Sequence, residues 1–238
     1  MNGMFRRTAA LALAAALMLP LAACGKGSDT VGPNNTPAAE ATLPPEPEPY
    51  DILDPTVMPE GGVRDGVTYV AYDGIVEHLF FHPVIAYPEY TFSSAIPADR
   101  QKGLDDWMVT ADEFKKILQS VYDKGYILVN MGDVWSEVTD ENGVTRMQRN
   151  TLMLPEGKKP LVISFDDVNY YQYMLEEGFT SKLVLGEDGQ IWAETKDPFT
   201  GEVSLTQDLD ATPILDNFVL EHPDFSLNGA KAIYSLTG

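Results

Sequence analysis

The sequence predicts an α/β fold for one globular domain between residues 60 and 238. Strand-like and helix-like segments alternate along this part of the chain, as they do in folds built on parallel sheets. The run KKPLVISFDD, residues 158–167, is apolar with almost no polar alternation, which is typical of a parallel strand covered on both faces. A length of about 180 residues is enough for a single domain with a substantial core.

Residues 1–23 have the pattern of a bacterial signal peptide. Arg6 and Arg7 form a positive start, and the apolar stretch after them is too short to span about 30 Å of hydrocarbon. The stretch ends in LAAC, which resembles the lipobox of bacterial lipoproteins and implies that Cys24 receives a diacylglyceryl group. Cys24 is the only cysteine in the chain, so an internal disulfide is excluded. We expect a lipid anchor in the outer leaflet of the bacterial plasma membrane, at the cell surface; the alternative is an ordinary cleavage site followed by a stray cysteine.

Residues 24–59 are rich in Pro and Glu and contain almost no large apolar side chains. A segment of this composition cannot bury enough surface to offset its ordering entropy. We therefore expect a disordered or polyproline-like tether between the anchor and the domain.

The clearest helix of the domain is expected over residues 110–125. It follows a strand at residues 66–75 and an apolar, strand-like run at residues 77–87. Thr110 and Glu113 form a capping box at its start, and Gly125 stands where a left-handed residue ends a helix. The segment YILVNMGDV, residues 126–134, predicts a strand directly after it.

The second half of the domain continues with short elements. Residues 136–151 predict short strands around the turn DENG, and residues 170–179 have helical character. Residues 181–195 predict a hairpin around Asp188-Gly189. A helix is expected from about Thr212 to Glu221, ended by Pro223, and a last strand in GAKAIYSLTG, residues 229–238.

Two adjacent carboxylates, Asp166 and Asp167, end the apolar run of residues 158–167. Functional residues of parallel α/β sheets gather at the carboxyl ends of the strands. One carboxylate can serve as a general base and its neighbour as a metal ligand. The alternative is a solvated acidic pair in the turn that follows the strand.

Three segments, in this order, resemble the polysaccharide deacetylases, metal-dependent enzymes that remove N-acetyl groups from carbohydrates. SFDDV, residues 164–168, is similar to the family's T-F-D-D-G at the end of an apolar strand. Residues 108–135 resemble the family's preceding helix, GY pair and strand, and GAKAIYSLTG resembles its second barrel strand. The resemblance covers roughly residues 75–238. It implies the start of a distorted parallel (β/α) barrel of polysaccharide deacetylase type, preceded by an N-terminal β/α extension.

By this resemblance Asp166 is the catalytic base and Asp167 is a ligand of a divalent metal of the zinc type. This chain departs from the family pattern in that Val168 replaces the usual glycine and residues 170–210 form an unusually long segment before the next strand. The family also takes two histidine ligands from an H-x-x-x-H motif beyond its second strand, where this sequence stops. We therefore expect a fragment truncated after its second barrel strand, without the histidine ligands and catalytically incomplete.

The three histidines of the chain do not replace those ligands. His78 and His82 lie four residues apart in a strand-like run that ends at Pro83. His82 matches the family's upstream Y-H position, which is not a metal ligand, and is a candidate for substrate contact. His222 is expected to cap a helix or lie on the surface.

The function that the resemblance implies is hydrolysis of carbon–nitrogen bonds in N-acetylated cell-wall or surface polysaccharide. The formal net charge of −20 argues against nucleic acid or anionic lipid as a partner. Further candidates for stacking on sugar rings are Tyr170, Tyr171, Tyr173 and Trp192, although aromatic side chains more often pack in a core.

Two other interpretations remain open from the residues. One is a non-catalytic glycan-binding or structural lipoprotein with a degenerate deacetylase fold, in which the aspartate pair binds Ca²⁺ or nothing. The other is a phosphotransfer domain, because an acidic pair after a buried strand also holds Mg²⁺. Export to the cell surface argues against the second, since phosphodonors are cytosolic.

Overall fold

The computed structural model describes residues 62–64 and 66–237. The expected signal peptide (1–23), the lipidation site Cys24 and the tether (24–59) lie outside the described residues. Within the described part, no helix has the length and apolar character needed to cross a membrane.

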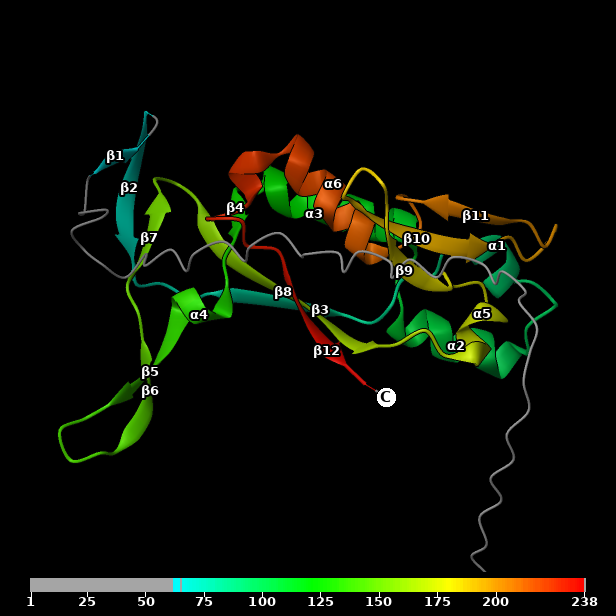
Figure 1. Cartoon of the computed structure of the whole chain (residues 1–238), viewed down its shortest axis with the longest axis horizontal. Helices are drawn as coiled ribbons and strands as arrows, with labels where there is room; N and C mark the ends of the chain where they lie inside the picture. The colour runs from blue at the N-terminus through cyan, green and yellow to red at the C-terminus, as the bar shows by residue number, and fades with distance from the viewer. Residues whose placement is uncertain (1–61, 65, 238) are drawn as a thin grey trace, which may run out of the picture. The chain divides into compact units, whose positions relative to one another are not determined.

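A parallel sheet forms the centre of the described domain (Figure 1). Strand β8 (Lys159–Val168) lies between β3 (Glu77–Phe81) and β12 (Ala232–Leu236), and both neighbours run parallel to it. Strand β4 (Tyr126–Leu128) pairs in parallel with the beginning of β8. The expected parallel strand at residues 158–167 is therefore confirmed.

Helices α3 (Ala111–Asp123) and α6 (Ala211–Glu221) cover one face of this sheet (Figure 1). Side chains alternate between the two faces of a strand, and Leu161, Ile163 and Phe165 of β8 are buried on the helix side. The ring of Phe165 lies 5.7 Å from that of Phe81, 5.5 Å from Phe114 and 5.3 Å from Tyr234. This aromatic cluster joins three strands and α3.

The opposite face of the sheet is covered only in part. Val162 belongs to a second apolar cluster with residues of β4 and β7 (Leu152–Pro155). Farther along, Phe80 and Ile233 flank Ser164 on the neighbouring strands. Phe80 is 58% exposed and Ile233 is 41% exposed, so the described residues leave this part of the face open.

The expected caps of helix α3 are confirmed. The Thr110 hydroxyl accepts a hydrogen bond from the Glu113 N–H at 3.1 Å, and Glu113 accepts one from the Thr110 N–H at 2.8 Å. Gly125, which follows the C-cap, has a φ of 78°, a left-handed conformation that glycine adopts without steric cost. Strand β4 begins at the next residue.

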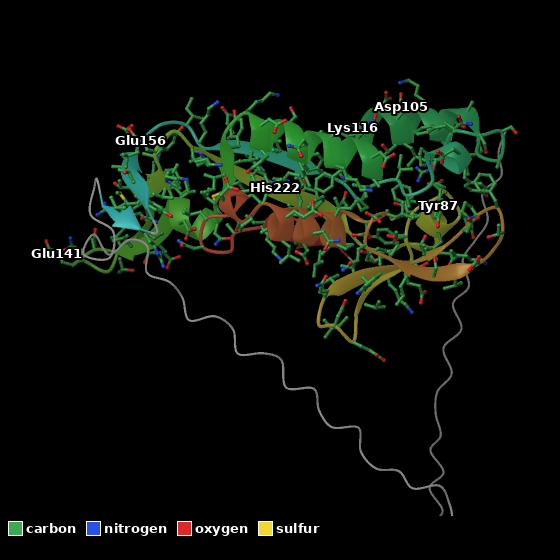
Figure 2. All side chains as sticks on the ribbon, turned by 90° about the horizontal axis from the view of Figure 1, so that it is seen from above. Tyr87, Asp105, Lys116, Glu141, Glu156 and His222 are labelled. Atoms are coloured by element: carbon green, nitrogen blue, oxygen red, sulfur yellow. The ribbon has the colours of Figure 1, made fainter. Side chains whose placement is uncertain are left out.

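The remaining strands form small antiparallel sheets. β1 (Val63–Arg64), β2 (Val67–Tyr72) and β7 form one of them, and α4 (Met131–Val134) leads into the hairpin of β5 (Trp135–Thr139) and β6 (Thr145–Arg149). The turn between β5 and β6 is the predicted DENG, closed by the Gly143 N–H donating to the Asp140 carbonyl. Figure 2 shows Glu141 at the outer tip of this hairpin.

Residues 170–210, the long segment before the last strand, form short ordered elements. Helix α5 (Gln172–Leu175) is only one turn long, and the hairpin predicted around Asp188-Gly189 is confirmed as β9 (Lys182–Leu185) and β10 (Ile191–Lys196). β11 (Val203–Thr206) extends it to a three-stranded sheet. The segment packs beside α1 (Pro88–Thr91), because the Ala86 and Tyr87 N–H groups donate to the Gly178 carbonyl.

Two further short elements complete the described domain. Helix α2 (Ala98–Trp107) places Leu104 in a third apolar cluster with Ile85, Met174 and Phe179. A 3₁₀ turn (Pro223–Phe225) follows α6, as the helix-ending Pro223 predicted. The described residues form four separate sheets and no closed barrel, so the barrel of deacetylase type stays a prediction.

The capping box of α3 yields a pH-dependent prediction. Hydrogen bonds from Thr110 lower the pKa of Glu113 below its ordinary value. The stability that this carboxylate contributes is therefore present above the ordinary pKa of about 4.3 and is lost as the pH falls through the lowered value. In urea denaturation we expect Thr110→Ala to reduce the free energy of unfolding by about 1 kcal/mol at pH 7.

Glu113→Gln should show a deficit at pH 7 that shrinks below a pH of about 4. Glu141→Gln, at the exposed hairpin tip, is the matched control and should leave stability unchanged at pH 7. A deficit of Glu113→Gln that stayed constant down to pH 2 would contradict this assignment.

Candidate active site

Asp166 and Asp167 lie in a β-bulge near the carboxyl end of β8. Phe165 pairs with Tyr234 of β12, but the next pair joins Val168 to Leu236. The two aspartates therefore stand opposite the single residue Ser235. Asp167 has a φ of 53°, the left-handed conformation that one residue of such a bulge often adopts.

The bulge explains how an apolar strand can end in two carboxylates. Without the extra residue, the alternation of a strand would place Phe165 and Asp167 on the same, helix-covered face. With it, Val168 packs against the core beneath α3 and α6. The side chain of Asp167 is 64% exposed, and Asp166 is half-buried. The bulge thus keeps both carboxylates out of the core. The side chain of Val168 packs against the core in their stead.

The same backbone accounts for the valine in place of the family's glycine. A positive φ favours glycine, but among the aspartates and Val168 only Asp167 has a positive φ. Aspartate enters the left-handed region more readily than a β-branched residue does. Val168 therefore sits at a position where its β-branch causes no backbone strain.

His82 joins the aspartates from the neighbouring strand. His82 directly follows Phe81, the last residue of β3. Because Phe81 pairs with Phe165 of β8, His82 and Asp166 are the next residues along the two neighbouring strands. His82 Nδ1 lies 3.8 Å from Asp167 Oδ2, which is too far for a hydrogen bond but close enough for electrostatic attraction to a protonated imidazole. The structure thus brings together three of the predicted site residues, Asp166, Asp167 and His82.

Two aromatic side chains beside His82 were not identified from the sequence. The ring of Phe80 lies 6.3 Å from the imidazole, and that of Trp107 lies 6.4 Å from it, both edge to face. Trp107 is 69% exposed. In the sequence, Phe80 lies within an apolar run, and Trp107 ends a polar segment far from Phe80. Neither segment has a pattern that links its aromatic residue to the two aspartates.

His78 has a separate partner. Its Nε2 lies 2.9 Å from the hydroxyl of the buried Ser164. His222 ends α6, where its backbone N–H donates to the Phe218 carbonyl and its ring packs 4.4 Å from Tyr122. His222 thus stands at the helix end, as expected, and its ring packs against Tyr122, which the sequence did not indicate.

Tyr170 is held inside the domain by a buried carboxylate. Its hydroxyl donates to Asp210 Oδ2 at 3.1 Å, and the Thr180 hydroxyl donates to the same oxygen at 2.7 Å. The other oxygen of Asp210 accepts the Thr212 N–H at the start of α6. Burial, with the nearby Asp210 charge, raises the pKa of Tyr170 well above its usual range. These contacts indicate a packing role for Tyr170, as the alternative interpretation of the aromatic residues expected.

The other predicted sugar-stacking residues contact other side chains of the fold. Tyr171 and Tyr173 stack on each other at 5.6 Å with an interplanar angle of 12°, and both are exposed. The guanidinium of Arg100 lies 5.0 Å from the Tyr173 ring. The indole of Trp192 donates to Asp188 within its own hairpin.

An apolar pocket opens on the helix side of the bulge. It has a volume of about 480 Å³. Tyr234 in its wall donates to the Thr212 hydroxyl at 3.1 Å, and burial raises the pKa of Tyr234 to about 12. The residues around it are Val168, Asn169, Tyr170, Leu183, Thr212, Tyr234, Leu236 and Thr237.

The described side chains do not complete a zinc site. Zinc in proteins is held by three or four side-chain ligands. Among residues 62–64 and 66–237, no three His, Cys, Asp or Glu side chains are grouped closely enough to hold one ion. Asp167 has His82 and the adjacent Asp166 as its nearest candidates for co-ligands. This donor set does not fit the zinc site that the resemblance implies.

The left-handed bulge yields a prediction about stability. Asp167→Val should reduce the free energy of unfolding by about 1–2 kcal/mol, because a β-branched residue is strained at positive φ. Asp167→Gly should leave stability unchanged or raise it, since glycine removes that strain. The measurement is urea denaturation, with Asp166→Val as the control for the loss of a carboxylate at negative φ. Equal losses in Asp166→Val and Asp167→Val would contradict the bulge.

A scan against protein-family models, a search of curated proteins and a search of solved structures find no match to this chain. The resemblance to polysaccharide deacetylases therefore depends on the segments at residues 108–135, 164–168 and 229–238.

Proposed function

We propose that this chain acts on N-acetylated cell-wall or surface polysaccharide as part of a hydrolase of polysaccharide deacetylase type. The observation that carries the proposal is the bulge at the carboxyl end of β8, which turns Asp166 and Asp167 out of the core beside His82. Carboxylates at this end of a parallel sheet are in the usual position for catalysis. The exported, lipid-anchored form predicted from Cys24 would place the site next to such polymers.

Asp166 is the proposed general base. In the hydrolysis of an acetamide, the oxygen of water adds to the carbonyl carbon, the carbon–nitrogen bond breaks, and acetate and a free amine are released. A carboxylate within hydrogen-bond reach of that water can accept its proton and return it to the departing amine. Asp166 is half-buried on the central strand, and a half-buried position holds a base in place while leaving it accessible to water.

Asp167 is the proposed metal ligand, as the resemblance implies. Its carboxylate is exposed, and His82 Nδ1 lies 3.8 Å from Asp167 Oδ2. These two side chains would therefore be the first ligands of a shared ion. Because the described residues offer no third ligand at this place, we derive no step of the reaction through a metal.

The incomplete ligand set favours a second candidate function. A lipoprotein that binds glycan without hydrolysing it needs no metal, and the same exposed carboxylates can accept hydrogen bonds from sugar hydroxyls. This candidate predicts binding of N-acetylated glycan with no release of acetate.

Acetate release from N-acetylglucosamine oligomers tests the proposal. Under the hydrolase proposal the protein, supplied with Zn²⁺ or Co²⁺, should release acetate, and Asp166→Asn should reduce the rate by roughly 10²–10⁴-fold, the usual contribution of a general base. Asp105→Asn on α2, an exposed aspartate labelled in Figure 2, is the matched control and should keep the full rate. Unchanged release in Asp166→Asn would rule out the base; binding without any release would favour the second candidate.

Zinc binding is a separate test of the ligand assignment. We expect the chain to bind zinc only weakly, because its described residues supply fewer ligands than a zinc site requires. Calorimetric titration with Zn²⁺ measures this, and Asp167→Ala should abolish the weak binding that remains. Tight stoichiometric binding, or binding indifferent to Asp167→Ala, would refute the ligand assignment.

A further inference from the structure

Phe80 and Trp107 expose two large aromatic rings at one place on the surface. Phe80 is 58% exposed and Trp107 is 69% exposed, and each packs its ring edge to face with His82. Single exposed apolar side chains are common on proteins, whereas contiguous apolar surface marks a binding site more often. Here residues from β3 and α2, distant in sequence, place two exposed rings against one imidazole.

Regular secondary structure holds the backbone of both residues. Phe80 belongs to β3 and pairs with Ser164 of the central strand. Trp107 is the last residue of α2, three residues after the buried Leu104 that anchors this helix. Because rigid elements carry the two rings, little side-chain and backbone freedom is lost when a ligand binds there.

Polar groups lie beside the rings. His82 contacts both rings, and its Nδ1 is 3.8 Å from the exposed carboxylate of Asp167. The carboxylate accepts hydrogen bonds, and a neutral imidazole offers one donor and one acceptor. The surface therefore combines flat apolar area with groups of both hydrogen-bonding kinds.

We propose that Phe80 and Trp107, with His82 and Asp167, form a subsite that binds one pyranose ring of a neutral N-acetylated glycan. A pyranose has apolar C–H faces that suit an aromatic ring, and hydroxyls around its rim that both donate and accept hydrogen bonds. An ammonium ligand would use the carboxylate but has no acceptor for an imidazole N–H. A polyanion would be repelled by a chain of net charge −20. This inference rests on the proposed function, and it names the side chains that bind the substrate of the proposed hydrolase.

Fluorescence titration tests the subsite without requiring hydrolysis. Replacing Trp135 and Trp192 by phenylalanine leaves Trp107 as the only indole of the chain. Titration with N-acetylglucosamine oligomers should then change its emission in a saturable way. In the otherwise unchanged chain, with binding followed by calorimetry, Trp107→Ala and Phe80→Ala should each weaken binding at least tenfold. Phe80→Tyr, which keeps a ring, should restore binding.

Trp135→Ala is the matched control, because Trp135 is an indole that is 41% exposed on β5. It should bind like the unchanged chain. Thermal unfolding of each variant shows that a loss of binding is not a loss of fold. A chain that binds oligomers without releasing acetate would fail the hydrolase proposal and still support the subsite.

Three results would overturn the subsite. One is unchanged affinity in both Trp107→Ala and Phe80→Ala, and another is an equal loss in Trp135→Ala. The third is tighter binding of oligomers with free amino groups than of fully N-acetylated ones, which would make the surface a cation site.

Discussion

The structure depends on the burial of one strand, β8, between two parallel neighbours and two helices. Its residues Leu161, Ile163 and Phe165 pack under α3 and α6, and its backbone pairs with β3, β4 and β12. Burial of large apolar side chains contributes about 1.5–3 kcal/mol each, so the strand brings together segments that lie more than a hundred residues apart. A defect in β8 would therefore disturb every element that positions the candidate site.

The candidate site arises where this burial ends. As long as β8 alternates, every second residue must be apolar, and an aspartate at residue 167 would face the core. The extra residue in the bulge breaks the alternation, so Val168 returns to the core and the carboxylates of Asp166 and Asp167 remain outside it. The same constraint that stabilises the sheet thus determines where charge can be placed, and it places that charge next to His82 on the adjacent strand.

Local features of the chain could be predicted well from sequence, because their causes lie within a few residues. The capping box of Thr110 and Glu113 and the turn at Asp188-Gly189 are of this kind, and so is the uninterrupted apolar run of β8. The bulge could not be predicted, since it depends on the register between β8 and β12. The anchoring of residues 170–210 could not be predicted for a similar reason, because it uses a buried carboxylate, Asp210, that accepts hydrogen bonds from hydroxyls 30 and 40 residues away in sequence.

The aromatic surface shows why residue type alone did not locate ligand contacts. Tyr170 and Trp192 were reasonable candidates by composition, but their polar atoms are engaged by Asp210 and Asp188 within the fold. Phe80 and Trp107 contact the imidazole of His82 and remain 58% and 69% exposed. An aromatic side chain is available to a ligand when the core does not need it. In this domain, that condition is met on the face toward which the bulge turns the two aspartates.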